Sequence, residues 1–177
     1  MRQEERRART RATLLRAAAS AFATRGYDGA SIDAIAASVR LSKGAVYAHF
    51  PSKLDLYLEV LAMLREQAEH RLERVTAAIA AGSGAMDAAR QYLGLGGDAQ
   101  HAALMSEFWR TAAIEPAIRG VLERLVEDRL GLLSRAAVDQ GMAPGAAMEF
   151  AEAVARFIDA ELLYRRIGDA AAHPASS

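Results

Sequence analysis

Cysteine and asparagine are absent from the 177 residues, and only four prolines and two lysines occur. Without cysteine the chain has no disulfide framework, no thiolate zinc site and no cysteine nucleophile. No apolar run reaches the length of a membrane span, and the charged residues 1–11 do not lead into the apolar stretch of a secretory signal. We therefore expect a soluble protein of the cytoplasm that does not associate with membranes.

β-Branched residues are also scarce, since 20 valines, isoleucines and threonines stand against 41 alanines. Alanine is the best helix former, whereas β-branched residues favour strands, so the composition predicts an all-α fold. Apolar residues at three- and four-residue spacing, serine caps and glycine stops predict about eight helices. The expected ranges are 4–24, 32–39, 43–50, 53–81, 85–93, 99–113, 116–140 and 145–167, with a helix cap at Asp98 and a flexible tail over 169–177.

Charge is balanced over the whole chain, with 22 basic and 22 acidic residues, but it is uneven along it. Residues 1–53 carry ten basic and four acidic groups, and the acidic excess lies in the remainder. A basic end on a neutral protein indicates a local surface for a polyanion. The alternative is a solvated helix face with incidental arginines, and the charge pattern alone does not decide between them.

Residues 31–50 predict a helix-turn-helix, in which two short helices are joined by a tight turn. Ser31 and Ser42 are good helix N-caps. Val46 and Phe50 give the second helix a buried face, which leaves polar side chains outside. Tyrosine, histidine and lysine donate hydrogen bonds to phosphate, and small residues let the backbone approach DNA closely. Lysine at position 53 stands at a helix start, where free backbone N–H groups favour a phosphate.

The segments AAASAFATRGYDGASIDAIA and LSKGAVYAHFPSKLDLY resemble the TetR family of bacterial transcriptional regulators, over residues 8–68. The resemblance implies a DNA-binding domain that includes the helix-turn-helix. It also implies that Ser31, Tyr47, His49 and Lys53 hold phosphates while Lys43, Gly44 and Ala45 lie over base edges. The full set of expected DNA-binding residues is Ser31, Arg40, Ser42, Lys43, Gly44, Ala45, Tyr47, His49 and Lys53.

Two residues depart from the family pattern. Arg40 stands where the family usually has glycine in the turn, at a position that often needs a positive φ and costs another residue about 1 kcal/mol. Either Arg40 bears that strain alone or its side chain reaches a phosphate. Asp33 stands where some members have a basic or polar DNA contact, and we expect its carboxylate to serve the helix dipole instead.

For residues 69–168 the resemblance implies a helical domain for ligand binding and dimerisation. The family usually dimerises through an eighth and a ninth helix, whereas eight are counted here, so either the seventh and eighth serve or dimerisation is weakened. Arg129 and Glu161 interrupt apolar stripes and either contact a ligand or pair with each other. The candidate pocket residues are Tyr92, His101, Met105, Phe108, Trp109, Leu125, Arg129, Phe157 and Glu161, and the alternative is that the aromatic and methionine residues are plain core.

Enzyme readings have little support. Residues 94–99 match a dinucleotide-binding motif, but the preceding segment is predicted to be helix rather than strand. The four histidines are scattered, so we expect no catalytic residues, no metal and no cofactor. The sequence favours a dimeric, ligand-responsive repressor with three partners: a pseudo-palindromic DNA operator in the nucleoid, an unidentified small-molecule effector and a second copy of itself. The alternative is a helical adaptor that binds another protein and contacts DNA non-specifically.

Overall fold

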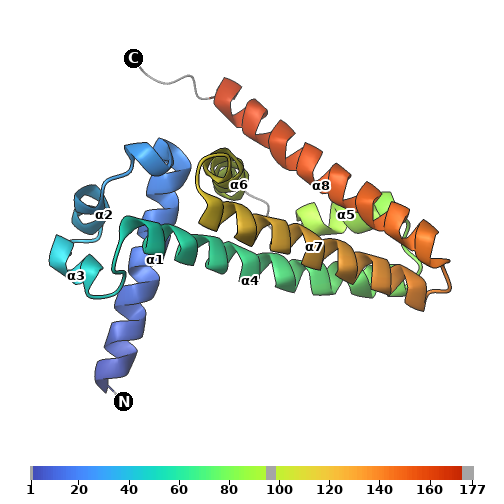
Figure 1. Ribbon diagram of the computed structural model, residues 1–177, viewed down its shortest axis with the longest axis horizontal. Helices are drawn as coiled ribbons and strands as arrows, with labels where there is room; N and C mark the ends of the chain where they lie inside the picture. Colours follow the sequence, from blue (N-terminus) through green and yellow to red (C-terminus); the bar gives the residue numbers. More distant parts are fainter. Residues whose placement is uncertain (1, 95–98, 173–177) are drawn as a thin grey trace.

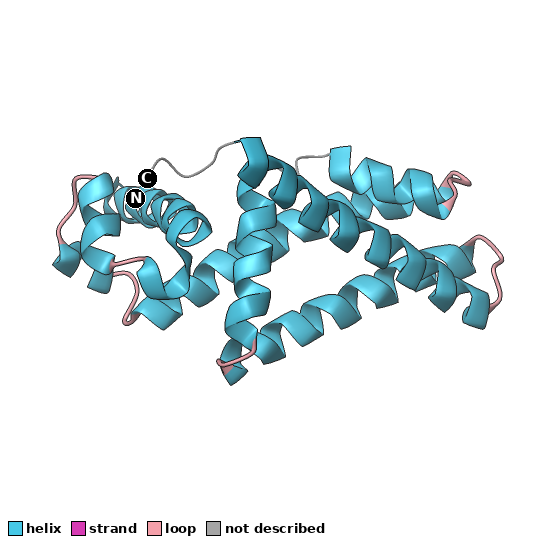
Figure 2. Cartoon of the chain, turned by 90° about the horizontal axis from the view of Figure 1, so that it is seen from above, coloured by secondary structure: helices cyan, strands magenta, loops and turns pink. Residues whose placement is uncertain are grey.

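The computed structural model describes residues 2–94 and 99–172, and all regular secondary structure within them is helical, as predicted (Figure 2). Asp98, the expected helix cap, and most of the motif at 94–99 lie outside these residues. The last helix continues through residues 169–172, which the sequence analysis assigned to a flexible tail. The helices are α1 (Arg2–Gly29), α2 (Ile32–Ser38), α3 (Lys43–Tyr47), α4 (Lys53–Ala80), α5 (Ala85–Gly94), α6 (Ala99–Ala112), α7 (Pro116–Asp139) and α8 (Pro144–Ala172).

Helices α1 to α3 form a head at one end of an elongated molecule (Figure 1). Helix α4 leaves the head and runs along the body, where it packs against α5 and α7. Helix α8 packs on α5 and α7, and α6 lies between this body and the head, in contact with α1. None of the described helices is long and apolar enough to cross a membrane.

Three serines begin the short helices of the head and the long helix that follows. The hydroxyls of Ser31, Ser42 and Ser52 accept hydrogen bonds from backbone N–H groups three residues later, at 3.1, 3.2 and 3.0 Å. Each cap satisfies a donor that the first helical turn leaves free. The caps therefore fix the residues at which α2, α3 and α4 begin.

The hydrophobic core has two parts. The first joins the head to α6 and the start of α7, and on α4 it ends at Leu64. The second begins on α4 at Leu72 and fills the space between α4, α5, α7 and α8. Because the first core includes Phe108 and Ile118, the head does not end where α4 leaves it but is packed directly against α6 and α7.

A carboxylate seals the contact between α6 and the head. Glu107 is buried on α6 and accepts a hydrogen bond from the backbone N–H of Tyr27, directly after the kink that Gly26 makes in α1 with a φ of 70°. Arg110 donates to both carboxylate oxygens, at 2.9 and 2.6 Å. A Cβ atom at position 26 would lie 3.1 Å from Oε1 of Glu107, so glycine is needed there both for its φ and for this close approach.

The same face of α6 carries Thr111, whose hydroxyl lies 3.0 Å from the buried hydroxyl of Tyr57 on α4. Tyr57 also contacts the rings of Phe22, Tyr27 and Phe108, with centroids 4.8, 4.7 and 4.4 Å away. Such aromatic pairs add to the stabilisation that burial alone provides. Helices α1, α4 and α6 therefore meet in one packed and hydrogen-bonded junction.

Burial tends to raise the pKa of the Glu107 carboxyl, but hydrogen bonds from Arg110 and from the Tyr27 N–H outweigh it, so this pKa lies below its usual value. The ionised form is therefore favoured in the folded protein. Its stabilising contribution is complete above the unfolded-state pKa of about 4.3 and is lost as the pH falls through the lower folded-state pKa.

We expect Glu107→Gln to lower the free energy of unfolding by about 1–2 kcal/mol at pH 7, because charge-assisted hydrogen bonds become neutral ones. The deficit should shrink as the pH falls below about 4.3, since the wild-type carboxylate then also becomes neutral. Urea unfolding at several pH values measures both effects, with Glu123→Gln, an exposed change on α7, as the control. A deficit that does not change with pH would show that the charge of Glu107 is not what stabilises the junction.

The turn between α2 and α3 contains one strained residue. Arg40 has a φ of 57°, the single positive value at a non-glycine position among the described residues. The family's usual glycine would adopt this conformation without steric cost. The side chain of Arg40 is exposed, so the backbone carries the strain while the guanidinium lies on the head's surface.

We expect Arg40→Gly to raise the free energy of unfolding by about 0.5–1 kcal/mol. Glycine removes the steric strain of the positive φ, and part of that gain is offset because glycine makes the unfolded chain more flexible. Arg40→Ala removes the same side chain but keeps a Cβ atom, and it should therefore give no gain. Urea unfolding of the two variants separates backbone from side chain. Equal gains in both would mean that the guanidinium, and not the φ angle, is responsible for the strain.

Candidate nucleic-acid interface and ligand cavity

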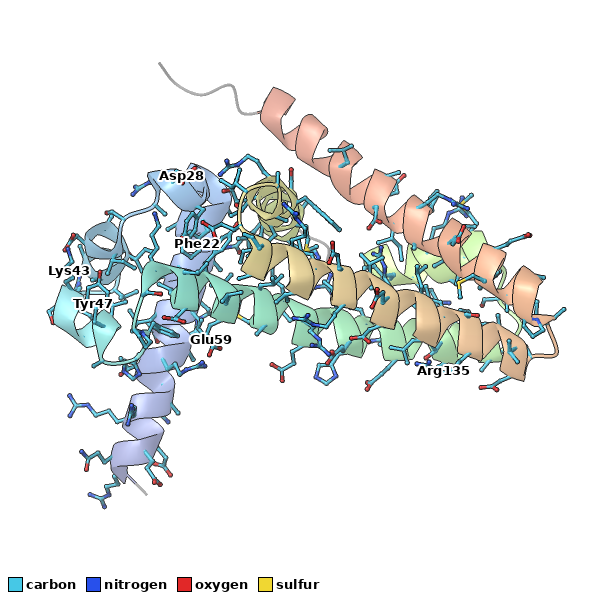
Figure 3. All side chains as sticks on the ribbon, viewed as in Figure 1. Phe22, Asp28, Lys43, Tyr47, Glu59 and Arg135 are labelled. Carbon is cyan, nitrogen blue, oxygen red and sulfur yellow. The ribbon has the colours of Figure 1, made fainter. Side chains whose placement is uncertain are left out.

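Helix α3 has one buried and one exposed face. Val46 and the following Phe50 are buried, whereas Lys43 and Tyr47 are exposed and lie at the outer edge of the head (Figure 3). Tyr47 is 44% exposed, which is high for an aromatic side chain that packing could have covered. The exposed face thus offers an ammonium group and a phenol to a partner.

Lys43 has a partner within the head. Its Nζ atom lies 2.8 Å from a carboxylate oxygen of Asp33 on α2, and both side chains are exposed. The hydrogen bond and the charge of Asp33 raise the pKa of Lys43 above its usual value. Asp33 does lie in the first turn of α2, as expected for the helix dipole, but the sequence analysis did not anticipate that it also pairs with Lys43.

Lys53 begins α4 and lies against the end of α1. Its ammonium group is 4.6 Å from the centre of the Tyr27 ring and 3.5 Å from the backbone oxygen of Asp28. A cation on an aromatic face is held in place without being neutralised. Lys53 therefore remains a positive charge beside the N-terminus of α4, the position at which a phosphate is favoured.

His49 lies beside the arginines of α1. Burial first, and then the charges of Arg7 and Arg11, lower the pKa of His49, so its imidazole is neutral at pH 7. Arg11 also lies 5.3 Å from the centre of the Phe50 ring and pairs with Glu59 on α4 at 2.6 Å. These contacts bring the basic residues of α1 next to α3, an arrangement that the helical periodicity of α1 did not reveal.

The remaining predicted DNA-binding residues lie in the same head. The side chains of Ser31, Arg40 and Ser42 are exposed, as is Gly44, while Ala45 is half-buried. Both serine hydroxyls serve as helix caps, which leaves each hydroxyl proton available for a second acceptor. All nine predicted residues therefore belong to the helix-turn-helix and the start of α4.

A cavity of about 770 Å³ lies in the body, lined by residues of α4, α5, α6, α7 and α8. This volume is within the usual range for sites that bind small molecules. Most of the lining is apolar, with charged side chains from α4, α7 and α8. Six of the nine predicted pocket residues line it: Tyr92, His101, Met105, Trp109, Leu125 and Arg129.

The other three predicted pocket residues do not line this cavity. Phe108 points to the opposite side of α6, where it is fully buried against Tyr57 in the junction. Phe157 packs on the second core. Glu161 does not pair with Arg129, because Asp159 does so with two hydrogen bonds of 2.9 and 2.8 Å, and residues two apart on a helix face different sides.

Sequence reasoning missed three further polar residues. Glu107 lies in the junction, Asp159 pairs with Arg129, and Arg71 is buried on α4 at 7% exposure. The position of Arg71 within the apolar stripe of α4 was the one signal that it could be buried. An arginine at such a position usually extends its long side chain into solvent, so the signal was weak. Among the residues that the structure describes, no group of three histidines or carboxylates has the arrangement of a metal site.

Comparison with known proteins identifies the head. Residues 14–60 match the family model for bacterial regulatory proteins of the tetR family. The HTH-type transcriptional activator FasR of Mycolicibacterium smegmatis is 51% identical over 51 residues, which are 29% of this chain and 23% of that protein. The match therefore spans about a quarter of the relative's length.

Solved structures match over most of the chain. A transcriptional regulator from Rhodococcus has a TM-score of 0.73 at 24% identity, and the match covers 93% of this chain and 87% of that one. A regulator from Saccharomonospora viridis, solved in complex with choline, has a TM-score of 0.63 at 21% identity, with 94% and 97% covered. At these identities the likeness to solved structures establishes the fold alone. The head of this chain is similar to the DNA-binding domain of bacterial regulatory proteins of the tetR family, and the whole chain has the fold of the solved transcriptional regulators.

Proposed function

We propose that the protein is a sequence-specific DNA-binding transcriptional regulator, and that it acts as a dimer whose affinity for DNA is set by a small molecule. The observation that carries the proposal is the exposed face of α3, with Lys43 and Tyr47 outermost, on a head that matches the family model over residues 14–60. Helix α3 would enter the major groove, while Lys53 and the caps of the short helices would lie along the phosphates.

In this proposal residues 8–68 form the DNA-binding unit and residues 69–168 the unit for the effector and the dimer. Two heads about one helical turn apart would read the two halves of a pseudo-palindrome. Exposed apolar side chains on the last two helices that do not line the cavity, namely Val138 and Met148, support a partner surface there. Such residues bury their apolar area when a second copy packs against them.

The route from effector to DNA would run through α6. Its residues His101, Met105 and Trp109 line the cavity, while Glu107 and Thr111 on its other side hold α1 and α4. A ligand that shifts α6 would therefore shift the contacts that orient the head. To release DNA, the ligand must bind more tightly to the conformation in which the heads do not fit the operator.

We further propose that the regulator represses, which requires an operator that overlaps a promoter. The relative from Mycolicibacterium smegmatis is named as an activator, and one structural neighbour was solved in complex with choline. Proteins similar to this chain therefore include one that activates transcription and one that binds a small molecule. Neither the sign nor the ligand of those proteins is transferred to this chain.

Selection of bound duplexes from a random DNA pool, followed by sequencing, tests the function directly. We expect an enriched inverted repeat, because two symmetric heads read two half-sites. Lys43→Ala, which removes an exposed side chain from this face of α3, should reduce the enrichment, whereas the exposed change Glu123→Gln on α7 is the control and should leave it unchanged. Binding without any enriched sequence would overturn the proposal in favour of an adaptor that contacts DNA non-specifically.

We expect Lys53→Ala to weaken binding to all duplexes alike, since a phosphate contact carries no sequence information. The slope of log affinity against log salt concentration should become shallower by about one for each head. Tyr47→Phe should also weaken binding but leave the slope unchanged, because it removes a hydroxyl and no charge. Fluorescence anisotropy at several salt concentrations measures both, and a changed sequence preference with intact affinity for Lys53→Ala would contradict the role given to Lys53.

A further inference from the structure

One buried guanidinium beside the cavity lacks a matching carboxylate. Arg71 on α4 is 7% exposed, and its Nη1 atom has no hydrogen-bond partner. Its Nη2 atom lies 3.4 Å from Nδ1 of His101, and the guanidinium lies 5.6 Å from the centre of the Tyr92 ring. None of the carboxylates whose side chains the structure describes forms an ion pair with it. A buried cation is unfavourable unless an anion compensates it.

The two side chains that flank Arg71 both line the cavity, as does a second incompletely satisfied arginine. Arg129 on α7 uses its two terminal nitrogens to bind Asp159, while its Nε atom is buried and has no partner. Burial raises the pKa of the Tyr92 hydroxyl, while the positive charges of Arg71 and Arg129 act in the opposite direction and lower it. The two orphan N–H groups therefore belong to the same region, around Tyr92.

Most charges on the cavity wall are paired, and the exception among the described side chains is Arg135, which is exposed to solvent. Arg65 binds Glu69 at 2.7 Å and lies 3.4 Å from Asp128, and Arg129 is paired with Asp159. Arg71 is a buried positive charge behind the wall, where it contacts the two lining residues Tyr92 and His101. The rest of the lining is largely apolar and includes Leu64, Leu72, Met105, Leu125 and Leu132.

We propose that the effector is an amphipathic carboxylate, with its acid group bound by Arg71 near Tyr92 and its apolar part along the leucine-rich wall. The proposal rests on the proposed function, whose effector it specifies. Nη1 of Arg71 and Nε of Arg129 are both buried donors without an acceptor, and guanidinium groups bind a planar carboxylate well. A quaternary ammonium or a neutral head group would leave the Arg71 charge uncompensated.

Three probes with the same apolar chain test the head-group preference: decanoate, decanol and decyltrimethylammonium. Trp109 is the one tryptophan of the chain and lines the cavity at 48% exposure, so its fluorescence reports binding without DNA. We expect decanoate to bind about tenfold more tightly than decanol, since a charge-assisted hydrogen bond is worth about that factor, and decyltrimethylammonium to bind most weakly. Equal binding of the three, or preference for the ammonium, would overturn the proposal.

Substitution of Arg71 locates the preference. Arg71→Met should bind decanoate no better than decanol, retain decanol binding and unfold at no lower temperature than the wild type, because a buried unpaired charge is removed. Arg74→Gln, an exposed change on the same helix, is the control and should keep the wild-type preference. If Arg71→Met does not fold, Arg71→Lys keeps the charge and should preserve the order of the three probes with weaker decanoate binding. A wild-type preference in Arg71→Met, or its loss in Arg74→Gln or Arg71→Lys, would overturn the assignment to Arg71.

Binding of the unliganded protein to the selected duplex separates this inference from the function on which it rests. Intact DNA binding together with a failed head-group preference overturns the carboxylate effector and leaves the regulator. A decanoate preference that depends on Arg71, in a protein without sequence-specific DNA binding, would support the carboxylate site and overturn the regulator.

Discussion

The carboxylate of Glu107 holds the two parts of the molecule together. It is buried on α6, receives the backbone N–H of Tyr27 and is braced by Arg110. The kinked end of α1 follows from it, because only glycine at position 26 leaves room for the carboxylate. Without this contact the last turn of α1 would have an unsatisfied backbone donor at a part-buried position, beside the hydrophobic core that the head shares with α6 and α7.

Helix α6 is consequently a wall shared by two environments. On one side its side chains line the cavity, and on the other they contact the aromatic junction around Tyr57. Because protein interiors are close-packed, a displacement of such a helix cannot be absorbed within either environment alone. Because one core joins the head to α6 and α7, the two proposed units are packed directly against each other.

Much of the fold could be predicted because its signals are local. Serine caps and glycine stops gave helix ranges that differ from the observed ones by a few residues, apart from the ends of α1, α3 and α8. The positive φ at Arg40 was likewise visible as an arginine in place of the family's glycine. The pocket was only partly predictable, because periodicity identifies the apolar side of a helix but not which neighbour covers it. Phe108 faces the junction for that reason, and Arg71 and Glu107 gained their roles from helices distant in sequence.

The ion pair between Asp33 and Lys43 has a consequence for how the head would bind DNA. Lysine at this position carries its own counter-charge, so any phosphate that approaches it competes with a carboxylate already in contact. A base edge that Lys43 contacts would have to displace or share the same carboxylate, so the net gain from that contact would be smaller than the gain from an unpaired lysine. The pair would therefore hold the ammonium group in one orientation before DNA arrives, at the cost of part of the affinity that its charge could supply.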